Sequence, residues 1–118
     1  MLEVNFYNAS NGKRPVAEYI DSLNSKQAKK VAWVLNVVES MNQVPTNYLK
    51  KLKSTDDIWE VRIQFASNIF RLLGFIEKER LILTNGFTKK TQKTPRREIE
   101  KAERRKANYV TRKRNKNE

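Results

Sequence analysis

The fold is decided by two runs in the middle of the chain, Ile58-Trp-Glu-Val-Arg-Ile-Gln-Phe65 and Ile69-Phe-Arg-Leu-Leu-Gly-Phe-Ile76. Apolar and polar side chains alternate in the first run, and a period of two is typical of a strand with one buried face. The second run begins after a short connection, which is the spacing of a hairpin. These residues therefore predict two neighbouring antiparallel strands.

The register of this hairpin predicts which side chains share a face of the sheet. If Ser67 and Asn68 form a two-residue loop, Ala66 faces Ile69 in the next strand. Cross-strand partners leave the sheet on the same side. The core face is then expected to carry Trp59, Val61, Ile63, Phe65, Phe70, Leu72 and Ile76, and the open face Glu60, Arg62, Gln64, Arg71, Leu73 and Phe75.

Two arginines, Arg62 and Arg71, are expected to lie diagonally across this open face. Neighbouring guanidinium groups repel each other unless an anion lies between them, and their forks match phosphate oxygens. An exposed Phe75 beside them would let an unpaired base stack. The pattern indicates a phosphate-binding face; the alternative is that Glu60 neutralises Arg62 and the face is merely solvated.

The remaining elements follow from the same rules. Pro15 suits the first turn of a helix, and Asn24 with Gln27 forms the pattern of a helix cap. The buried stripe of the second helix is expected to hold Ala28, Val31, Ala32, Leu35 and Val38, with Met41 near its end. Strands are expected at 2–7 and 80–87, and a last helix from Thr94-Pro95 that frays from about residue 111. The predicted order is β-α-α-β-β-β-α, an α+β fold in one domain over residues 1–118, with both N-terminal helices on one face of the sheet.

Composition restricts the chemistry of any site. The 118 residues include no cysteine and no histidine, which removes thiolate ligands, the commonest metal ligand and the commonest general base. Asp56-Asp57, the only adjacent acidic pair, is interpreted as a turn. Neither a metal nor another cofactor is expected.

The charge is concentrated near the end of the chain. The net charge is +12, and the last 31 residues carry 13 Lys and Arg against 4 Asp and Glu. A concentrated cationic segment attracts polyanions, so nucleic acid is the expected partner; the alternative is a solvated basic tail. No signal peptide or membrane-length apolar stretch is visible, and a cytoplasmic protein with no membrane partner is expected.

Four segments in fixed order carry a resemblance to a known family. They are residues 48–53 (YLKKLK), 58–63 (IWEVRI), 70–73 (FRLL) and 86–95 (GFTKKTQKTP). Together they resemble the phage-derived, Gp49-like branch of HigB toxins in the RelE superfamily, over roughly residues 2–110. The resemblance implies a RelE-like fold and a toxin of a type II toxin–antitoxin system. It implies a ribosome-dependent mRNA endoribonuclease that acts in the A site, beside ribosomal RNA, and is neutralised by a HigA-like helix-turn-helix antitoxin.

The implied reaction is a metal-independent transesterification, in which a 2′-hydroxyl attacks the adjacent phosphate. Pre-placed cations would stabilise the phosphorane. By position, the resemblance implies catalytic roles for Arg71, Arg62, Lys89, Lys90 and Lys93, with Arg71 first; the substrate-binding candidates are Phe75, Gln64, Glu60, Lys53 and Arg96.

The proton acceptor stays open on the sequence alone. Without histidine it could be Glu60, a tyrosine, a group of the ribosome, or a lysine whose pKa neighbouring cations depress. Tyr109 is the only tyrosine of the expected last helix. Two other functions compete with the enzyme: a non-catalytic RNA- or DNA-binding module, and an inactivated toxin that only binds its antitoxin.

Overall fold

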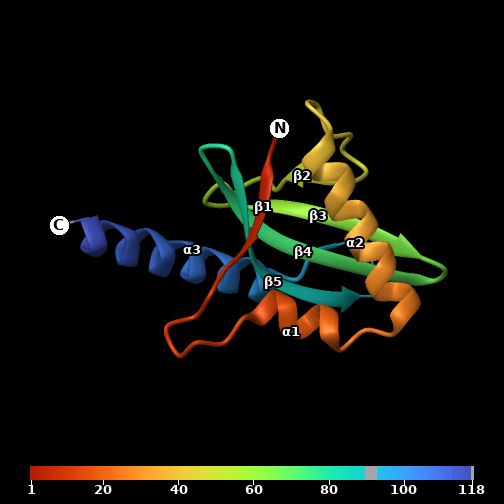
Figure 1. Ribbon diagram of the computed structural model, residues 1–118, viewed down its shortest axis with the longest axis horizontal. Coiled ribbons are helices and arrows are strands. Elements are labelled where there is room, and N and C mark those ends of the chain that lie inside the picture. Colours follow the sequence, from red (N-terminus) through yellow and green to blue (C-terminus); the bar gives the residue numbers. More distant parts are fainter. Residues whose placement is uncertain (90–92, 118) are drawn as a thin grey trace.

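The protein forms one five-stranded sheet with helices on both faces (Figure 1). The computed structural model describes residues 1–89 and 93–117. Along the chain the elements are β1 (Glu3–Phe6), α1 (Pro15–Asp21), α2 (Ser25–Ser40), β2 (Leu49–Lys51), β3 (Trp59–Phe65), β4 (Asn68–Glu77), β5 (Arg80–Lys89) and α3 (Arg96–Asn117). The strand order is β1-β5-β4-β3-β2, with β1 parallel to β5 and every other pair antiparallel. The predicted α+β class is confirmed.

The N-terminal helices start where the sequence predicts. Pro15 is the first residue of α1. At α2 the side chain of Asn24 accepts from the Gln27 backbone N–H at 2.9 Å, while the Gln27 side chain accepts from the Asn24 N–H at 3.1 Å. This reciprocal cap satisfies two donors that a helix start otherwise leaves without a partner.

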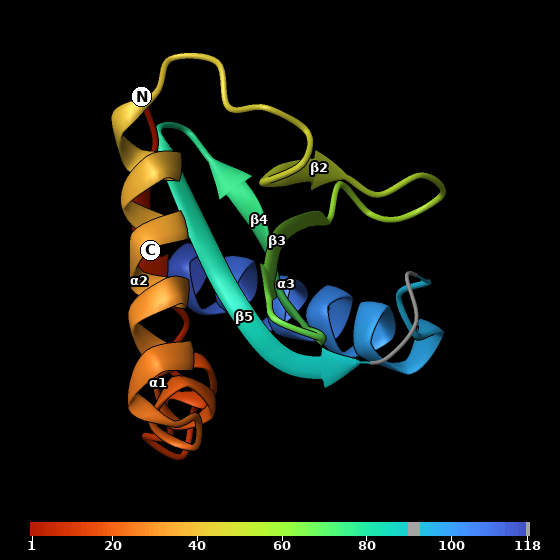
Figure 2. The ribbon, with the colours of Figure 1, turned by 90° about the vertical axis from the view of Figure 1, so that its right-hand side faces the viewer.

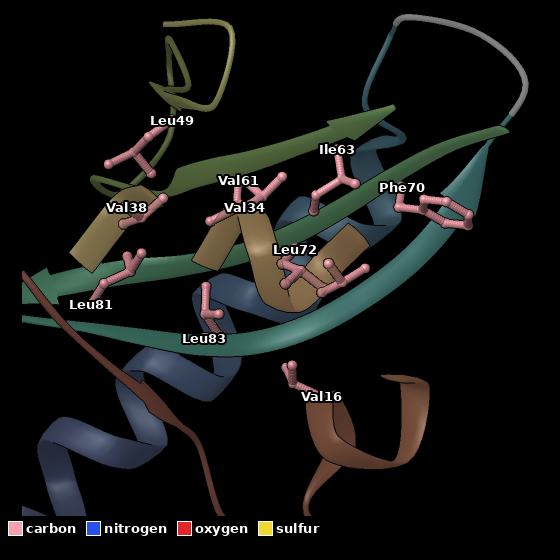
Figure 3. Packing of buried hydrophobic residues seen from close by; sticks show 11 residues of the cluster. Val16, Val34, Val38, Leu49, Val61, Ile63, Phe70, Leu72, Leu81 and Leu83 are labelled. Carbon is pink, nitrogen blue, oxygen red and sulfur yellow. The ribbon is translucent and has the colours of Figure 1, made fainter. Parts of the chain in front are cut away.

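The main core lies between the sheet and the pair α1 and α2 (Figure 3). Val61, Ile63, Phe70 and Leu72 point into it, which confirms the predicted core face. The predicted stripe of α2 is partly wrong: the buried residues are Val31, Val34 and Val38, whereas Ala32 and Met41 are exposed. The predicted stripe included Ala32 instead of Val34, because both residues fit an apolar pattern at helical spacing.

The hairpin loop is one residue earlier than predicted. Phe65 pairs with Asn68, so Ala66 and Ser67 form the loop, with Ala66 at φ 57°. The pairing between the two strands is therefore shifted by two positions from the prediction. Side chains alternate between the faces of a sheet with a period of two, so this shift leaves every side chain on its predicted face. Arg62 consequently lies directly opposite Arg71 rather than diagonal to it.

The expectation of an open sheet face is wrong, because α3 packs across it (Figure 2). Ala102 lies against Leu73 and Ile58, all fully buried. Tyr109 covers Phe75 in a T-shaped contact, at 5.3 Å between ring centroids, and Phe75 is only 2% exposed. Helices therefore cover both faces of the sheet.

Two further features at the ends of elements differ from the prediction. The last helix continues to Asn117 instead of fraying from about 111. Lys113 donates to Glu77 at 2.8 Å, which attaches this part of α3 to the end of β4. The short edge strand β2 was not predicted, since three residues with two lysines carry too little alternation to be recognised.

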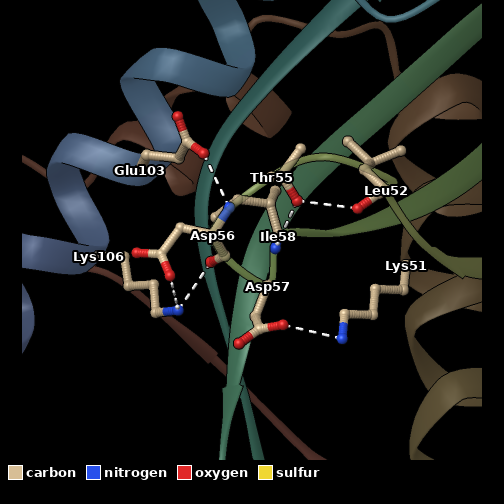
Figure 4. A network of polar contacts seen from close by, with 8 residues as sticks. All are labelled: Lys51, Leu52, Thr55, Asp56, Asp57, Ile58, Glu103 and Lys106. Atoms are coloured by element: carbon tan, nitrogen blue, oxygen red, sulfur yellow. Dashed lines mark hydrogen bonds and ion pairs between the residues drawn. The ribbon is translucent and has the colours of Figure 1, made fainter.

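The loop between β2 and β3 is clamped onto α3 (Figure 4). Glu103 accepts from the Asp56 backbone N–H at 2.9 Å, and Lys106 donates to the Asp56 carbonyl at 2.7 Å. Asp57 forms an ion pair with Lys51 at 2.8 Å, and this contact lowers the pKa of the Asp57 carboxyl. Asp56 and Asp57 thus shape a loop, as interpreted from the sequence.

Within the ranges described, no helix combines the length and the apolar character needed to cross a membrane.

Candidate functional site: a carboxylate surrounded by cations

Glu60 on β3 is the centre of a polar cluster at one end of the sheet. Its Oε1 atom lies 3.4 Å from Nε of Arg62 and 3.3 Å from Nε of Arg71. The register explains the arrangement, since Arg62 and Arg71 are cross-strand partners and Glu60 is two residues before Arg62 on the same face. The anion between the two guanidinium groups is therefore a carboxylate of the chain itself.

The end of β5 and the residues before α3 complete this cluster. The Thr94 hydroxyl donates to Oε2 of Glu60, and the Lys89 ammonium lies 3.5 Å from the Thr94 hydroxyl. Lys89 leaves the sheet on the same face as Arg71, because Lys89 pairs with Ile69 and Ile69 is two residues before Arg71. Segments distant in sequence thus meet at one point, which we call the Glu60 cluster: Glu60, Arg62, Arg71, Lys89 and Thr94.

The Glu60 cluster holds more positive than negative charge. Three cationic side chains share one carboxylate. Burial lowers the pKa of Lys89, the charge of Arg71 lowers it further, and Glu60 opposes both. Burial likewise lowers the pKa of Arg71, which Glu60 again opposes, but an arginine stays charged at physiological pH. Such a site favours an added anion and a lysine that gives up its proton readily.

A comparison with models of protein families matches residues 18–107 to the phage-derived protein Gp49-like family. The chain belongs to the Gp49-like family. The match covers most of the chain and includes every member of the Glu60 cluster. This family belongs to the RelE/HigB toxin-like group, and its members are commonly toxins of toxin–antitoxin systems. A comparison with curated proteins finds no match.

The cationic residues of this Gp49-like protein differ in accessibility. The side chain of Arg62 is 27% exposed, whereas that of Arg71 is 4% exposed. Arg71 also donates to the Phe70 carbonyl at 3.1 Å. Arg62 is therefore the more accessible of the two guanidinium groups, and Arg71 is buried next to Glu60.

Of the predicted substrate-binding residues, only Glu60 lies inside the cluster. Gln64 is exposed on the same face of β3. Lys53 is exposed in the loop after β2, and Arg96 forms an ion pair with Glu100 at 3.4 Å on the surface of α3. The prediction of a stacking surface at Phe75 is wrong, because Tyr109 and α3 cover this ring.

The predicted catalytic lysines differ in their surroundings, and so does Tyr109, the tyrosine considered as a proton acceptor. Lys89 is buried in the cluster, Lys93 is exposed next to Thr94 in the chain, and Lys90 lies outside the described residues. Tyr109 contacts Phe75, and its hydroxyl donates to Glu77 at 3.3 Å. Its contacts therefore belong to a different part of the sheet from the Glu60 cluster.

Sequence reasoning missed two residues of this region. Thr94 was expected only to start a helix, yet it links Glu60 to Lys89. Lys50 on β2 is the cross-strand partner of Glu60 and is exposed, but its position depends on the strand that was not predicted. The only sequence signal for Lys50 was its place in the Tyr48–Lys53 segment.

Proposed function

We propose that this Gp49-like protein is a HigB-type toxin, an endoribonuclease that cuts mRNA on the ribosome in the cytoplasm. A HigA-like helix-turn-helix antitoxin would hold it inactive. The observation that carries the proposal is the Glu60 cluster, in which three cations share one carboxylate within a chain of a toxin-like family.

The chemistry requires positive charge at the phosphate and a group that accepts a proton. Arg62, the exposed guanidinium, would contact the scissile phosphate and stabilise the charge of the phosphorane. Arg71 would act through position, because its ion pair fixes Glu60 and its charge adds positive potential to the cluster. Lys93, exposed beside Thr94, remains a predicted further phosphate contact.

Lys89 is the favoured proton acceptor, since its pKa is lowered and its neighbours are cations. In the proposed step the 2′-hydroxyl gives its proton to the neutral Lys89 amine while its oxygen bonds to phosphorus. The bond from phosphorus to the 5′-oxygen breaks, and that oxygen takes a proton from solvent. The products are a 2′,3′-cyclic phosphate and a 5′-hydroxyl, with no metal in any step.

The direct test adds the purified protein to ribosomes programmed with an mRNA and maps the cuts. Wild-type protein should cut within the A-site codon, and Arg62→Ala should lower the cleavage rate by about 100-fold or more. Lys29→Ala, which removes one charge from the exposed side of α2, is the matched control and should cleave normally. Intact mRNA with the wild-type protein would contradict the proposed activity.

A non-catalytic RNA-binding module is the second candidate. It is favoured by one observation, that Glu60 already neutralises part of the charge of both arginines and Arg71 is almost fully buried. For this candidate the ribosome assay yields binding without cuts. Growth arrest on expression without an antitoxin would then also be absent.

A further inference from the structure

A second cationic hollow lies at the opposite end of the sheet from the Glu60 cluster. Its volume is about 530 Å³, and β1, the start of β5 and the last turns of α3 enclose it. The positively charged side chains that line it are Arg80, Arg112, Lys113 and Lys116. No Asp or Glu lines this hollow among the residues with described positions.

A cation–π contact and hydrogen bonds hold part of the hollow in place. The guanidinium of Arg112 lies 5.2 Å from the centre of the Tyr7 ring and donates to the Asn8 carbonyl. The Tyr7 hydroxyl in turn donates to Asn108 at 2.6 Å, which joins the end of β1 to α3. Arg112 is therefore pre-positioned rather than free in solvent, and a ligand that binds it loses little side-chain entropy.

Two donors at this hollow lack an acceptor. Within the described parts of the chain, neither Nδ2 of Asn5 nor Nε of Arg112 has a hydrogen-bond partner, although both atoms are buried. Buried donors are normally paired, so an unpaired one is a feature that requires an explanation. A ligand oxygen entering the hollow could pair with the Asn5 amide after a rotation of that side chain.

The charge of the hollow is only partly balanced. Glu77, at the end of β4, lies 2.8 Å from Lys113 and 3.6 Å from Arg80. It offsets one of the four cations, and Arg112 and Lys116 have no carboxylate within ion-pair distance in the described structure. The hollow therefore favours a ligand that brings several negative charges, or one charge within a polyanion.

We infer that this hollow binds a backbone phosphate of RNA, as a second contact remote from the cleavage cluster. Arg80 at the hollow and Lys89 in the Glu60 cluster are the two ends of β5, a strand about 30 Å long. Between them α3 exposes Arg97 and Arg104, which lie seven residues apart on one side of the helix, so an extended polyanion meets further cations between the two sites. This continuity favours RNA over an acidic peptide; the identity of the ligand as RNA rests on the proposed function.

The test measures RNA binding rather than cleavage, so it is independent of catalysis. The full chain is titrated into a fluorescent single-stranded 20-mer RNA at several salt concentrations. The variant Arg80→Gln/Lys116→Gln removes two charges from the rim of the hollow and leaves Glu77 paired with Lys113. The control Lys26→Gln/Lys29→Gln removes two exposed charges from α2, on the other face of the sheet.

The rim variant should weaken RNA binding on the order of tenfold and reduce the slope of log K against log salt by roughly 0.7, for one lost phosphate contact. The α2 control should change neither quantity. Equal effects of the two variants, or no binding of RNA by the wild-type protein, would overturn the inference. The binding results could follow this pattern while the wild-type protein fails to cleave mRNA on ribosomes. That outcome would contradict the proposed enzymatic activity and would still support the second RNA contact.

An NMR titration that follows the side-chain amide signal of Asn5 distinguishes the phosphate of RNA from free inorganic phosphate. RNA should shift this signal at micromolar concentration, while inorganic phosphate should need a far higher concentration. A poly-glutamate of matched charge that shifts it as strongly as RNA would overturn the assignment to RNA and indicate an acidic protein partner.

Discussion

At the scale of single residues, burial destabilises the charged side chains of the Glu60 cluster, and the ion pairs among them compensate. Glu60 and Arg71 are both almost fully buried, and each compensates the charge of the other. Breaking a buried ion pair from one side costs far more than replacing the whole pair. Lys89 lies at the edge of this pair, with its pKa lowered by burial and by Arg71. In the proposed function, the residues that stabilise this part of the fold are therefore also the residues that carry the reaction.

Glu60→Gln should lower the free energy of unfolding by about 3–5 kcal/mol, because it removes the buried carboxylate that pairs with the Arg71 guanidinium. Urea denaturation monitored by circular dichroism measures the change. Glu100→Gln, which removes the carboxylate of a surface pair with Arg96, is the matched control and should change stability by less than about 1 kcal/mol. A Glu60 variant as stable as this control would contradict the assigned pairing.

Lys89 should titrate below the value near 10.4 of a lysine in a free peptide. The folded protein then binds fewer protons at this site than the unfolded chain between the lowered pKa and about 10.4. The contribution of Lys89 to stability should therefore rise with pH across that window, and Lys89→Met should remove the rise. The ¹³Cε signal of Lys89 reports the titration, and a midpoint at or above the free-peptide value would refute the lowered pKa.

The sequence predicted the positions of some residues of the Glu60 cluster but not of others. Alternation along β3 and β4 was enough to place Glu60, Arg62 and Arg71 on one face, and an error of two positions in register did not alter that face. The cover over Phe75 could not be predicted, since it depends on where the last helix of the chain docks. The same long-range docking brings Thr94 to Glu60.

At the scale of elements, α3 decides how much of the sheet is left accessible. Ala102 is fully buried against Ile58 and Leu73, so α3 approaches the sheet closely there. A buried pair, Asn85 and Glu98, adds a hydrogen bond of 3.1 Å between β5 and the first turn of this helix. The sequence predicted this helix but not its docking on the sheet, because few apolar residues mark its buried side.

Ala102→Leu should lower the free energy of unfolding by about 1–3 kcal/mol, because the larger side chain overfills the contact between α3 and the sheet. Ala107→Leu, at an exposed position of the same helix, is the control for helix propensity and should be nearly neutral. Thermal unfolding of the two variants makes the comparison. Equal stability of both would show that α3 is not docked through Ala102.

At the scale of the whole molecule, charge is distributed along α3 and at both ends of the sheet. The excess of positive charge near the end of the chain was plain from the sequence, and it predicted nucleic acid as the partner. The sequence could not show that this charge divides between the Glu60 cluster and the hollow at Arg112, since β1 and α3 must first come together. The fold thus places one end of this basic segment beside the arginines of β3 and β4 and the other end beside the start of β5.

The most direct test of the central claim compares single-turnover cleavage of ribosome-bound mRNA by wild-type protein, Lys89→Met and Lys29→Met. The account predicts products with 2′,3′-cyclic phosphate and 5′-hydroxyl ends, a loss of rate of about 100-fold or more for Lys89→Met, and a wild-type rate for Lys29→Met. A wild-type rate for Lys89→Met with the same product ends would contradict the assignment of the reaction to the Glu60 cluster.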